Sequence, residues 1–244
     1  MGYLDSEPIP RRTMVLFFVV DTSGSMDGNK IGSVNTAIHE ILPELKDISA
    51  ENADAKIKIA VLEFSSGTKW IYDRPVDAET FRWNDLNAGG VTDFGEALKM
   101  LNQKLSRKEF MQDAVGSFAP VIILLSDGAP TDSYKTRLKE LKENNWFKAA
   151  IKIAIAIGED AKMDILEEFT GNSECVLLAG NPEVLKKMIR FASVSASQIG
   201  SRSTNAGVES KQDEMGKQLQ EFVKDELPTV QDTQHSNITG NDDW

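Results

Sequence analysis

The chain of 244 residues is poor in cysteine and histidine. Its single cysteine, Cys175, excludes an intrachain disulfide, and the apolar residues after it predict a thiol buried in a strand. The histidines are His39, inside a helical pattern, and His235, near the C-terminal end, so a Ser-His-Asp hydrolase is disfavoured. A protein without disulfides is expected in a reducing, cytoplasmic compartment.

Long apolar runs are also absent. No stretch reaches the roughly 18 to 20 apolar residues that a transmembrane helix needs, so we expect no membrane partner. The apolar residues 14–20 follow Arg11 and Arg12, as in a signal peptide, but they continue into Asp21 without a cleavage site of small residues. We therefore interpret this run as a central, buried strand.

Positive charge is scarce. The chain has 27 Lys and Arg residues against 38 Asp and Glu residues, which gives a net charge of −11. Nucleic-acid binding requires clustered basic side chains, so we expect no nucleic-acid partner. The acidity is compatible with a cation-binding protein and equally with simple solubility.

Strand-like runs alternate with helix-length amphipathic runs along the chain, which is typical of a parallel sheet covered on both faces. The pattern predicts strands at residues 14–20, 56–63, 69–73, 121–125, 148–157 and 175–178. It predicts helices at residues 30–47, 93–105, 133–144, 160–169 and 182–197, and Asp132 is the candidate N-cap of the third. Residues 56–73 are expected to form a hairpin closed by residues 65–67, which gives the sheet one antiparallel edge strand. The predicted fold class is therefore α/β and doubly wound, with a mostly parallel sheet.

The chain divides into three parts by composition. We expect an N-terminal extension at residues 1–12, one domain at 13–200 and an acidic, flexible tail at 201–244. Two features leave alternatives open. Pro43 inside the first helical pattern predicts a kink or an early end of that helix. Within the tail, residues 213–225 carry apolar side chains at helical spacing, so they either dock on a partner or pack back on the domain.

Three segments place oxygen-bearing side chains where expected strands end. The first strand continues into Asp21-Thr-Ser23-Gly-Ser25, a glycine-rich loop carries Thr92, and the fourth strand continues into Ser-Asp127. Carboxylates and hydroxyls are ligands for Mg²⁺, Mn²⁺ or Ca²⁺ rather than for zinc. The carboxyl ends of parallel strands form the crevice in which open α/β sheets usually bind ligands. The sequence therefore predicts a hard-cation site, although each hydroxyl taken alone is equally suited to capping a helix or a turn.

In this order, the three segments resemble the von Willebrand factor A fold with its metal-ion-dependent adhesion site, whose pattern is D-x-S-x-S followed by a distant Thr and a distant Asp. The resemblance covers about residues 13–200 and is Rossmann-like in fold. It implies five metal ligand positions, which are Asp21, Ser23, Ser25, Thr92 and Asp127. The expected ion is Mg²⁺, with Mn²⁺ or Ca²⁺ as alternatives. The resemblance also implies that the hydroxyls bind directly, Thr92 in the partner-bound state, and that the two acids act through water and hydroxyl contacts.

The sequence around Thr92 and Asp127 is most similar to that of the bacterial tellurium-resistance, TerY-type branch of that family. This likeness implies a non-enzymatic adhesion or scaffold module in a stress or phage response. The implied partners are a protein that contributes an Asp or Glu to the metal, a protein kinase and a PP2C-type phosphatase.

The strongest alternative is a Mg²⁺-dependent phosphatase of the haloacid-dehalogenase type, which also begins with an aspartate at the end of its first strand. Its general acid is an aspartate two residues later, where this chain has Ser23. Dinucleotide binding is disfavoured because no G-x-G-x-x-G follows a strand and opens a helix.

Overall fold

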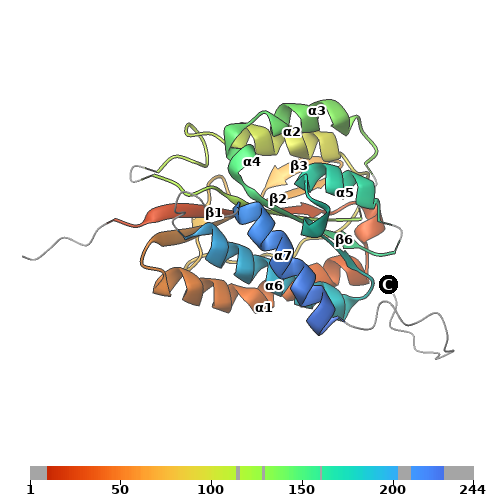
Figure 1. The fold of residues 1–244 in the computed structure, drawn as a ribbon. Helices are drawn as coiled ribbons and strands as arrows, with labels where there is room; N and C mark the ends of the chain where they lie inside the picture. Colours follow the sequence, from red (N-terminus) through yellow and green to blue (C-terminus); the bar gives the residue numbers. More distant parts are fainter. Residues whose placement is uncertain (1–9, 114–115, 128–129, 160, 203–209, 228–244) are drawn as a thin grey trace, which may run out of the picture.

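The computed structural model describes residues 10–113, 116–127, 130–159, 161–202 and 210–227. A sheet of seven strands runs through the middle of the molecule, with helices on both of its faces (Figure 1). The strand order is β3-β2-β1-β5-β6-β7, and β4 also pairs with β2. The strands are β1 (Arg12–Asp21), β2 (Ala55–Ser65), β3 (Gly67–Trp70), β4 (Val76–Asp77), β5 (Val121–Ser126), β6 (Ile151–Ile157) and β7 (Val176–Ala179).

The five strands β2, β1, β5, β6 and β7 are parallel, and β3 and β4 pair with β2 in the antiparallel direction. Strand β1 lies in the middle and is apolar on both faces, as expected for a strand of a covered parallel sheet. Its register with β2 pairs Asp21 with Phe64, and its register with β5 pairs Val20 with Leu125. The polar residues that follow these strands therefore meet at one edge of the sheet.

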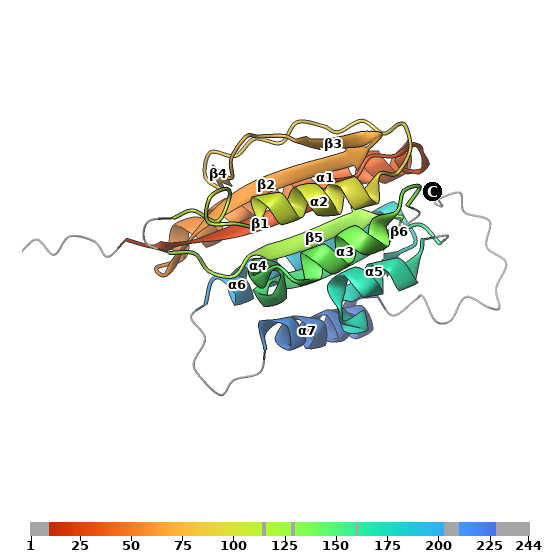
Figure 2. The ribbon, with the colours of Figure 1, turned by 90° about the horizontal axis from the view of Figure 1, so that it is seen from above.

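The helices form one layer on each face of the sheet (Figure 1), and Figure 2 looks down on one of these layers. One layer contains α1 (Asn29–Glu51), α6 (Pro182–Gly200) and α7 (Lys211–Glu226). The other contains α2 (Phe94–Lys104), α3 (Tyr134–Lys142), α4 (Asn145–Ala149) and α5 (Met163–Thr170), and two short 3₁₀ helices are η1 (Gly24–Met26) and η2 (Ser173–Cys175). Alternate residues of β1 pack into the two separate apolar cores, Phe18 into the first and Phe17 into the second. The predicted α/β fold class is confirmed.

Several element boundaries differ from the sequence-based prediction. Helix α1 continues through Pro43 to Glu51, so the early end that we considered is wrong; Pro43 is exposed, on the side of the helix away from the core. The strand predicted at 148–157 begins only at Ile151, because the Asn144 side chain accepts hydrogen bonds from the amides of Trp146 and Phe147 and starts α4. The hairpin at residues 65–67 is confirmed, and Gly67 there has a positive φ of 93°.

The C-terminal region contains a helix that packs on the domain. We predicted residues 201–244 as a flexible tail, whereas α7 buries Met215 and Leu219 completely in the core below the sheet. The Phe222 ring stacks on Phe191 of α6 with a centroid distance of 4.2 Å. The packing alternative for the apolar stripe therefore describes this helix, while residues 203–209, 228–244 and the N-terminal nine lie outside the described part of the chain. The domain boundary at residue 200 stays a prediction.

Two further expectations concern single side chains. Cys175 is fully buried, as predicted, but it ends η2 and the strand β7 begins only at Val176. His39 is exposed and pairs with Asp85 at 2.9 Å. His235 lies outside the described residues. Among the helices that the structure describes, none combines the length and apolar character required to cross a bilayer.

Candidate metal centre

The candidate centre lies at the carboxyl edge of the sheet, where the neighbouring strands β1 and β5 end. Asp21 is the last residue of β1, and Asp127 follows the last residue of β5. Since Val20 pairs with Leu125, the two carboxylates lie close together, and the charge of Asp127 contributes to raising the pKa of Asp21. The sheet itself therefore places two acids beside each other.

Asp21 is completely buried, and both of its carboxylate oxygens accept hydrogen bonds. Oδ1 accepts from the Ser23 amide at 2.9 Å, and Oδ2 accepts from the Ser126 hydroxyl at 2.7 Å. Burial is the largest cause of a raised Asp21 pKa, and the hydrogen bonds from Ser23 and Ser126 partly offset it. Asp21 thus shapes the loop that follows β1 and carries charge into a desolvated site.

Asp127 is as inaccessible as Asp21 but lacks these hydrogen bonds. Its side chain is 3% exposed, and neither carboxylate oxygen accepts a hydrogen bond from any described residue. The Lys30 ammonium lies 3.7 Å from Oδ2. A buried carboxylate without hydrogen bonds is unfavourable unless a positive charge or metal compensates it. Lys30 compensates part of the charge, and the two oxygens without hydrogen bonds fit a cation that binds between the loops.

The hydroxyls of the first loop lie beside these acids. Ser23 Oγ and Ser25 Oγ are 3.1 Å apart; Ser23 is buried and Ser25 is exposed. Thr22 anchors the loop to β2, because its amide and its hydroxyl both donate to the Phe64 carbonyl. The 3₁₀ helix η1 then turns the chain toward α1. The loop therefore presents one shielded and one accessible hydroxyl.

The glycine-rich loop that carries Thr92 is tied to the first loop by two backbone hydrogen bonds. The Gly24 amide donates to the Gly90 carbonyl at 3.0 Å, and the Gly89 amide donates to the Thr22 carbonyl at 2.8 Å. Gly90 has a φ of 84°, and a Cβ there would lie 2.4 Å from Ser66 Oγ, so only glycine fits this close approach.

Thr92 itself is 5% exposed. Its amide donates to Thr131 Oγ1 at 3.1 Å, and its carbonyl accepts from the Thr131 amide at 2.9 Å. Thr92 and Ser126 line the same small cleft. The structure thus groups Asp21, Ser23, Ser25 and Asp127 directly, and it joins Thr92 to them through the backbone and through Ser126.

Two residues near the acids were missed by the sequence analysis. Ser126 donates to Asp21, and Lys30 of α1 approaches Asp127. Ser126 directly precedes Asp127 at the end of an apolar run, so its position was visible, but its partner was not. Asp132 corrects another expectation: instead of capping α3, its carboxylate accepts from the Gly95 and Glu96 amides and caps α2.

The donor set favours a hard cation. In the described part of the chain, no three residues among His, Cys, Asp and Glu are grouped so that they could hold a metal. A cation here would therefore depend on hydroxyl oxygens together with the two carboxylates, which is the oxygen-rich environment that Mg²⁺, Mn²⁺ and Ca²⁺ prefer.

The sequence profile of the von Willebrand factor type A domain matches residues 16–191, from β1 into α6. The chain belongs to the von Willebrand factor type A family. Domains of this family are typically metal-dependent interaction modules and are generally not enzymes. The match ends before α7, so the last described helix of this von Willebrand A protein is an addition to the matched region.

Known proteins resemble the chain in part of their sequence or in their fold. The inter-alpha-trypsin inhibitor heavy chain H1 of Bos taurus is 23% identical over 154 residues, which are 62% of this chain and 17% of that protein. A von Willebrand factor type A structure from Catenulispora acidiphila has a TM-score of 0.57 and 18% identity, covering 76% of this chain and 43% of that one. Proximal thread matrix protein 1 of the mussel byssus, in a structure described as having a zinc-occupied MIDAS motif, has a TM-score of 0.57 and 18% identity and covers 75% of this chain and 48% of that one. The chain thus spans less than half the length of these proteins.

Proposed function

We propose that the carboxyl edge of the sheet binds one divalent cation, Mg²⁺ by preference, and that the domain uses this ion to hold a carboxylate of a partner protein. The ligand positions are Asp21, Ser23, Ser25, Thr92 and Asp127. The observation that carries the proposal is Asp127, because both oxygens of its carboxylate are buried without a hydrogen bond from the described residues. Lys30 lies 3.7 Å from Oδ2, and a bound cation would add the direct ligation that the two oxygens lack.

The choice of ligands explains why the ion would attract a partner. Ser23, Ser25 and Thr92 provide neutral oxygens, so only the two acids offset the charge of the cation. The ion then remains electrophilic toward a further anionic oxygen. Ser25 is exposed, which leaves one side of the loop open to an approaching Asp or Glu. The zinc ion named for the mussel byssus protein supports a divalent cation in a site of this type.

The proposed role is adhesion or scaffolding rather than catalysis. Ser23 stands where the phosphatase alternative requires its general acid, and its hydroxyl contacts Ser25. Following the TerY-type likeness of the sequence, we propose a cytoplasmic tellurium-resistance-type stress or phage response as the setting. The proposed partners are a protein kinase and a PP2C-type phosphatase.

Isothermal titration with Mg²⁺ and Mn²⁺ tests the centre. The wild-type protein should bind one ion per chain, and Asp127→Asn should weaken binding by more than about tenfold, because it removes one of the two negative charges. Asp85→Asn is the matched control, since Asp85 is exposed and pairs with His39. Equal affinity in all three proteins would refute the site.

Partner capture tests the interaction. Purified kinase and PP2C-type phosphatase from the same source should bind with Mg²⁺ and dissociate with a chelator. Thr92→Ala should weaken this capture without changing the circular dichroism spectrum, whereas Thr36→Ala, on the exposed face of α1, should not. Capture that survives both the chelator and Thr92→Ala would place recognition elsewhere. Hydrolysis of an aryl phosphate that disappears in Asp21→Asn would instead favour an enzyme.

A further inference from the structure

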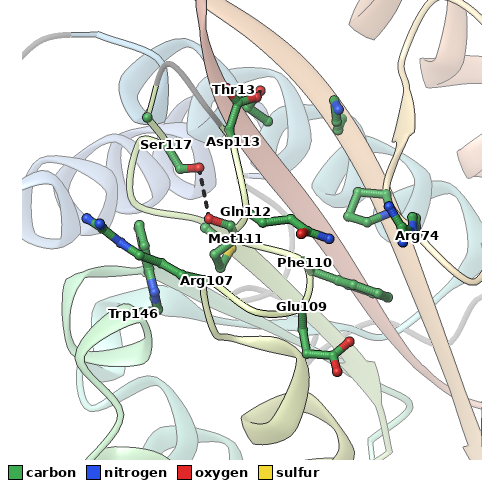
Figure 3. A pocket seen from close by; sticks show the side chains of 13 residues that line it. Thr13, Arg74, Arg107, Glu109, Phe110, Met111, Gln112, Asp113, Ser117 and Trp146 are labelled. Atoms are coloured by element: carbon green, nitrogen blue, oxygen red, sulfur yellow. Dashed lines mark hydrogen bonds between the residues drawn. The ribbon is translucent and has the colours of Figure 1, made fainter.

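A hollow of about 660 Å³ lies at the opposite, amino edge of the sheet (Figure 3). Thr13, at the start of β1, lines it, whereas Asp21 ends the same strand eight residues later, which corresponds to about 26 Å along an extended strand. The hollow is lined by two arginines, Arg74 and Arg107, by the amide of Gln112, and by the aromatic rings of Phe110 and Trp146, among other residues. The volume of the hollow is typical of a small-molecule site.

The acidic side chains of the hollow are already paired within the protein. Glu109 accepts a hydrogen bond from Lys104 at 2.7 Å, and Asp113 accepts one from the hydroxyl of Thr13. The ammonium of Lys58 lies 3.8 Å from Asp77. None of these carboxylates therefore needs an arginine of the hollow as its partner.

The arginines of the hollow differ from these groups. Neither Arg74 nor Arg107 makes a hydrogen bond or an ion pair with any residue that the structure describes, and the Gln112 side chain likewise has no such partner. Lys58 and Glu109 are paired with Asp77 and Lys104, so two arginine charges face the single charge of Asp113, and the hollow keeps a net charge of 2 − 1 = +1 in a chain whose net charge is −11. A local excess of positive charge attracts anions into a partly enclosed site.

The arrangement of the side chains suits an extended anion. In Figure 3, Arg74 and Arg107 stand on opposite sides of the hollow, and the Gln112 amide points from between them toward Arg74. A guanidinium can donate two parallel hydrogen bonds to a carboxylate or a phosphate. Trp146 is half-buried on the Arg107 side, where its ring offers an apolar wall.

We propose that this hollow is a second binding site, for a small organic anion that carries at least two acidic groups. One acidic group binds Arg74 and Gln112, a second binds Arg107, and the carbon frame between them lies near Trp146. Phosphate esters and polycarboxylates share this chemistry. The proposal is independent of the metal centre.

Titration calorimetry with citrate and with fructose 1,6-bisphosphate tests it, in low salt and in buffer freed of divalent cations on a chelating resin. At least one of these anions should bind saturably and more weakly as salt increases. Arg74→Gln and Arg107→Gln should each weaken binding by about tenfold, because each removes a charge-assisted pair. Arg137→Gln is the matched control, since Arg137 is a surface arginine paired with Glu140.

The outcomes separate the sources of the anion. Binding of the bisphosphate alone assigns a phosphate ester, and binding of citrate alone assigns a polycarboxylate. Asp127→Asn should bind like the wild type, which shows that the anion is not held at the metal centre. The proposal is overturned if neither anion binds, or if the Arg74 and Arg107 variants bind as tightly as the wild type while their unfolding midpoints are unchanged.

Discussion

The carboxyl edge of the sheet and the margin where α7 covers β6 differ in whether their buried polar groups have hydrogen-bond partners. At the margin, the Gln212 side chain accepts from the Lys152 amide at 2.7 Å and donates to the Lys152 carbonyl at 2.9 Å, as a neighbouring strand would. At the carboxyl edge, both oxygens of Asp127 are buried without a hydrogen bond from the described chain. Satisfied groups mark a region built for stability, and the unsatisfied acid marks a region that awaits a ligand.

This comparison predicts that changes at the two regions have separable effects. Changes at the α7 margin should alter the free energy of unfolding and leave cation binding intact. Changes at the carboxyl edge should weaken cation binding strongly and have a smaller effect on the cation-free stability. The predictions below test this separation from the largest effect to the smallest.

Truncation after Arg202 should have the largest effect. It removes α7 and uncovers the core that Met215 and Leu219 now fill, and losing each of these side chains costs about 2–5 kcal/mol. Urea unfolding should show a loss of at least about 4 kcal/mol, or an insoluble product. A truncated protein with the wild-type unfolding midpoint would show that α7 is not part of the stable domain.

Gln212→Ala should have an intermediate effect. It leaves the backbone amide and carbonyl of Lys152 without their partners, which costs about 1–3 kcal/mol for a buried group. Gln218→Ala, on the same helix, is the control, because no described residue is hydrogen-bonded to its side chain. Urea unfolding of the two variants checks this prediction, and equal midpoints would contradict it.

Ionisation of the Cys175 thiol, which is buried under α7, should have the smallest effect on stability near neutral pH. Burial raises its pKa to about 12 from the ordinary value of 9.0. The folded state therefore retains a proton that the unfolded state loses, and stability should fall as the pH rises from about 9 to about 12. At pH 8, labelling by a thiol reagent should be roughly a thousandfold slower in the folded state than in urea. Rapid labelling of the native protein would mean that this margin opens readily.

The sequence predicted the parallel strands and the grouping of the motif segments, because each motif follows a long apolar run and parallel strands end at one edge. It left open whether residues 213–225 pack on the domain or dock on a partner. The four apolar residues at helical spacing were visible, but only the tertiary structure shows the surface that receives them.

The sequence also did not predict which side chains form hydrogen bonds with each other. Ser126 was visible at the end of its strand, but its hydrogen bond to Asp21 depends on the register between β1 and β5. The start of α4 carried a local signal, since Asn144 is a good N-cap residue, yet the apolar residues after it favoured a longer strand. Neither the short strand β4 nor the pairing of Gln212 with Lys152 has a signature in the sequence alone.

The most direct test of the central claim is the melting temperature of three proteins with and without Mg²⁺. At about ten times the dissociation constant, Mg²⁺ should stabilise the wild type by about 1.4 kcal/mol, a shift of about 3–5 °C for a chain of this size. Gln212→Ala should melt lower and show the same shift. Asp127→Asn should show little or no shift, because one of the two charged ligands of the cation is lost. A full Mg²⁺ shift in Asp127→Asn would contradict the account.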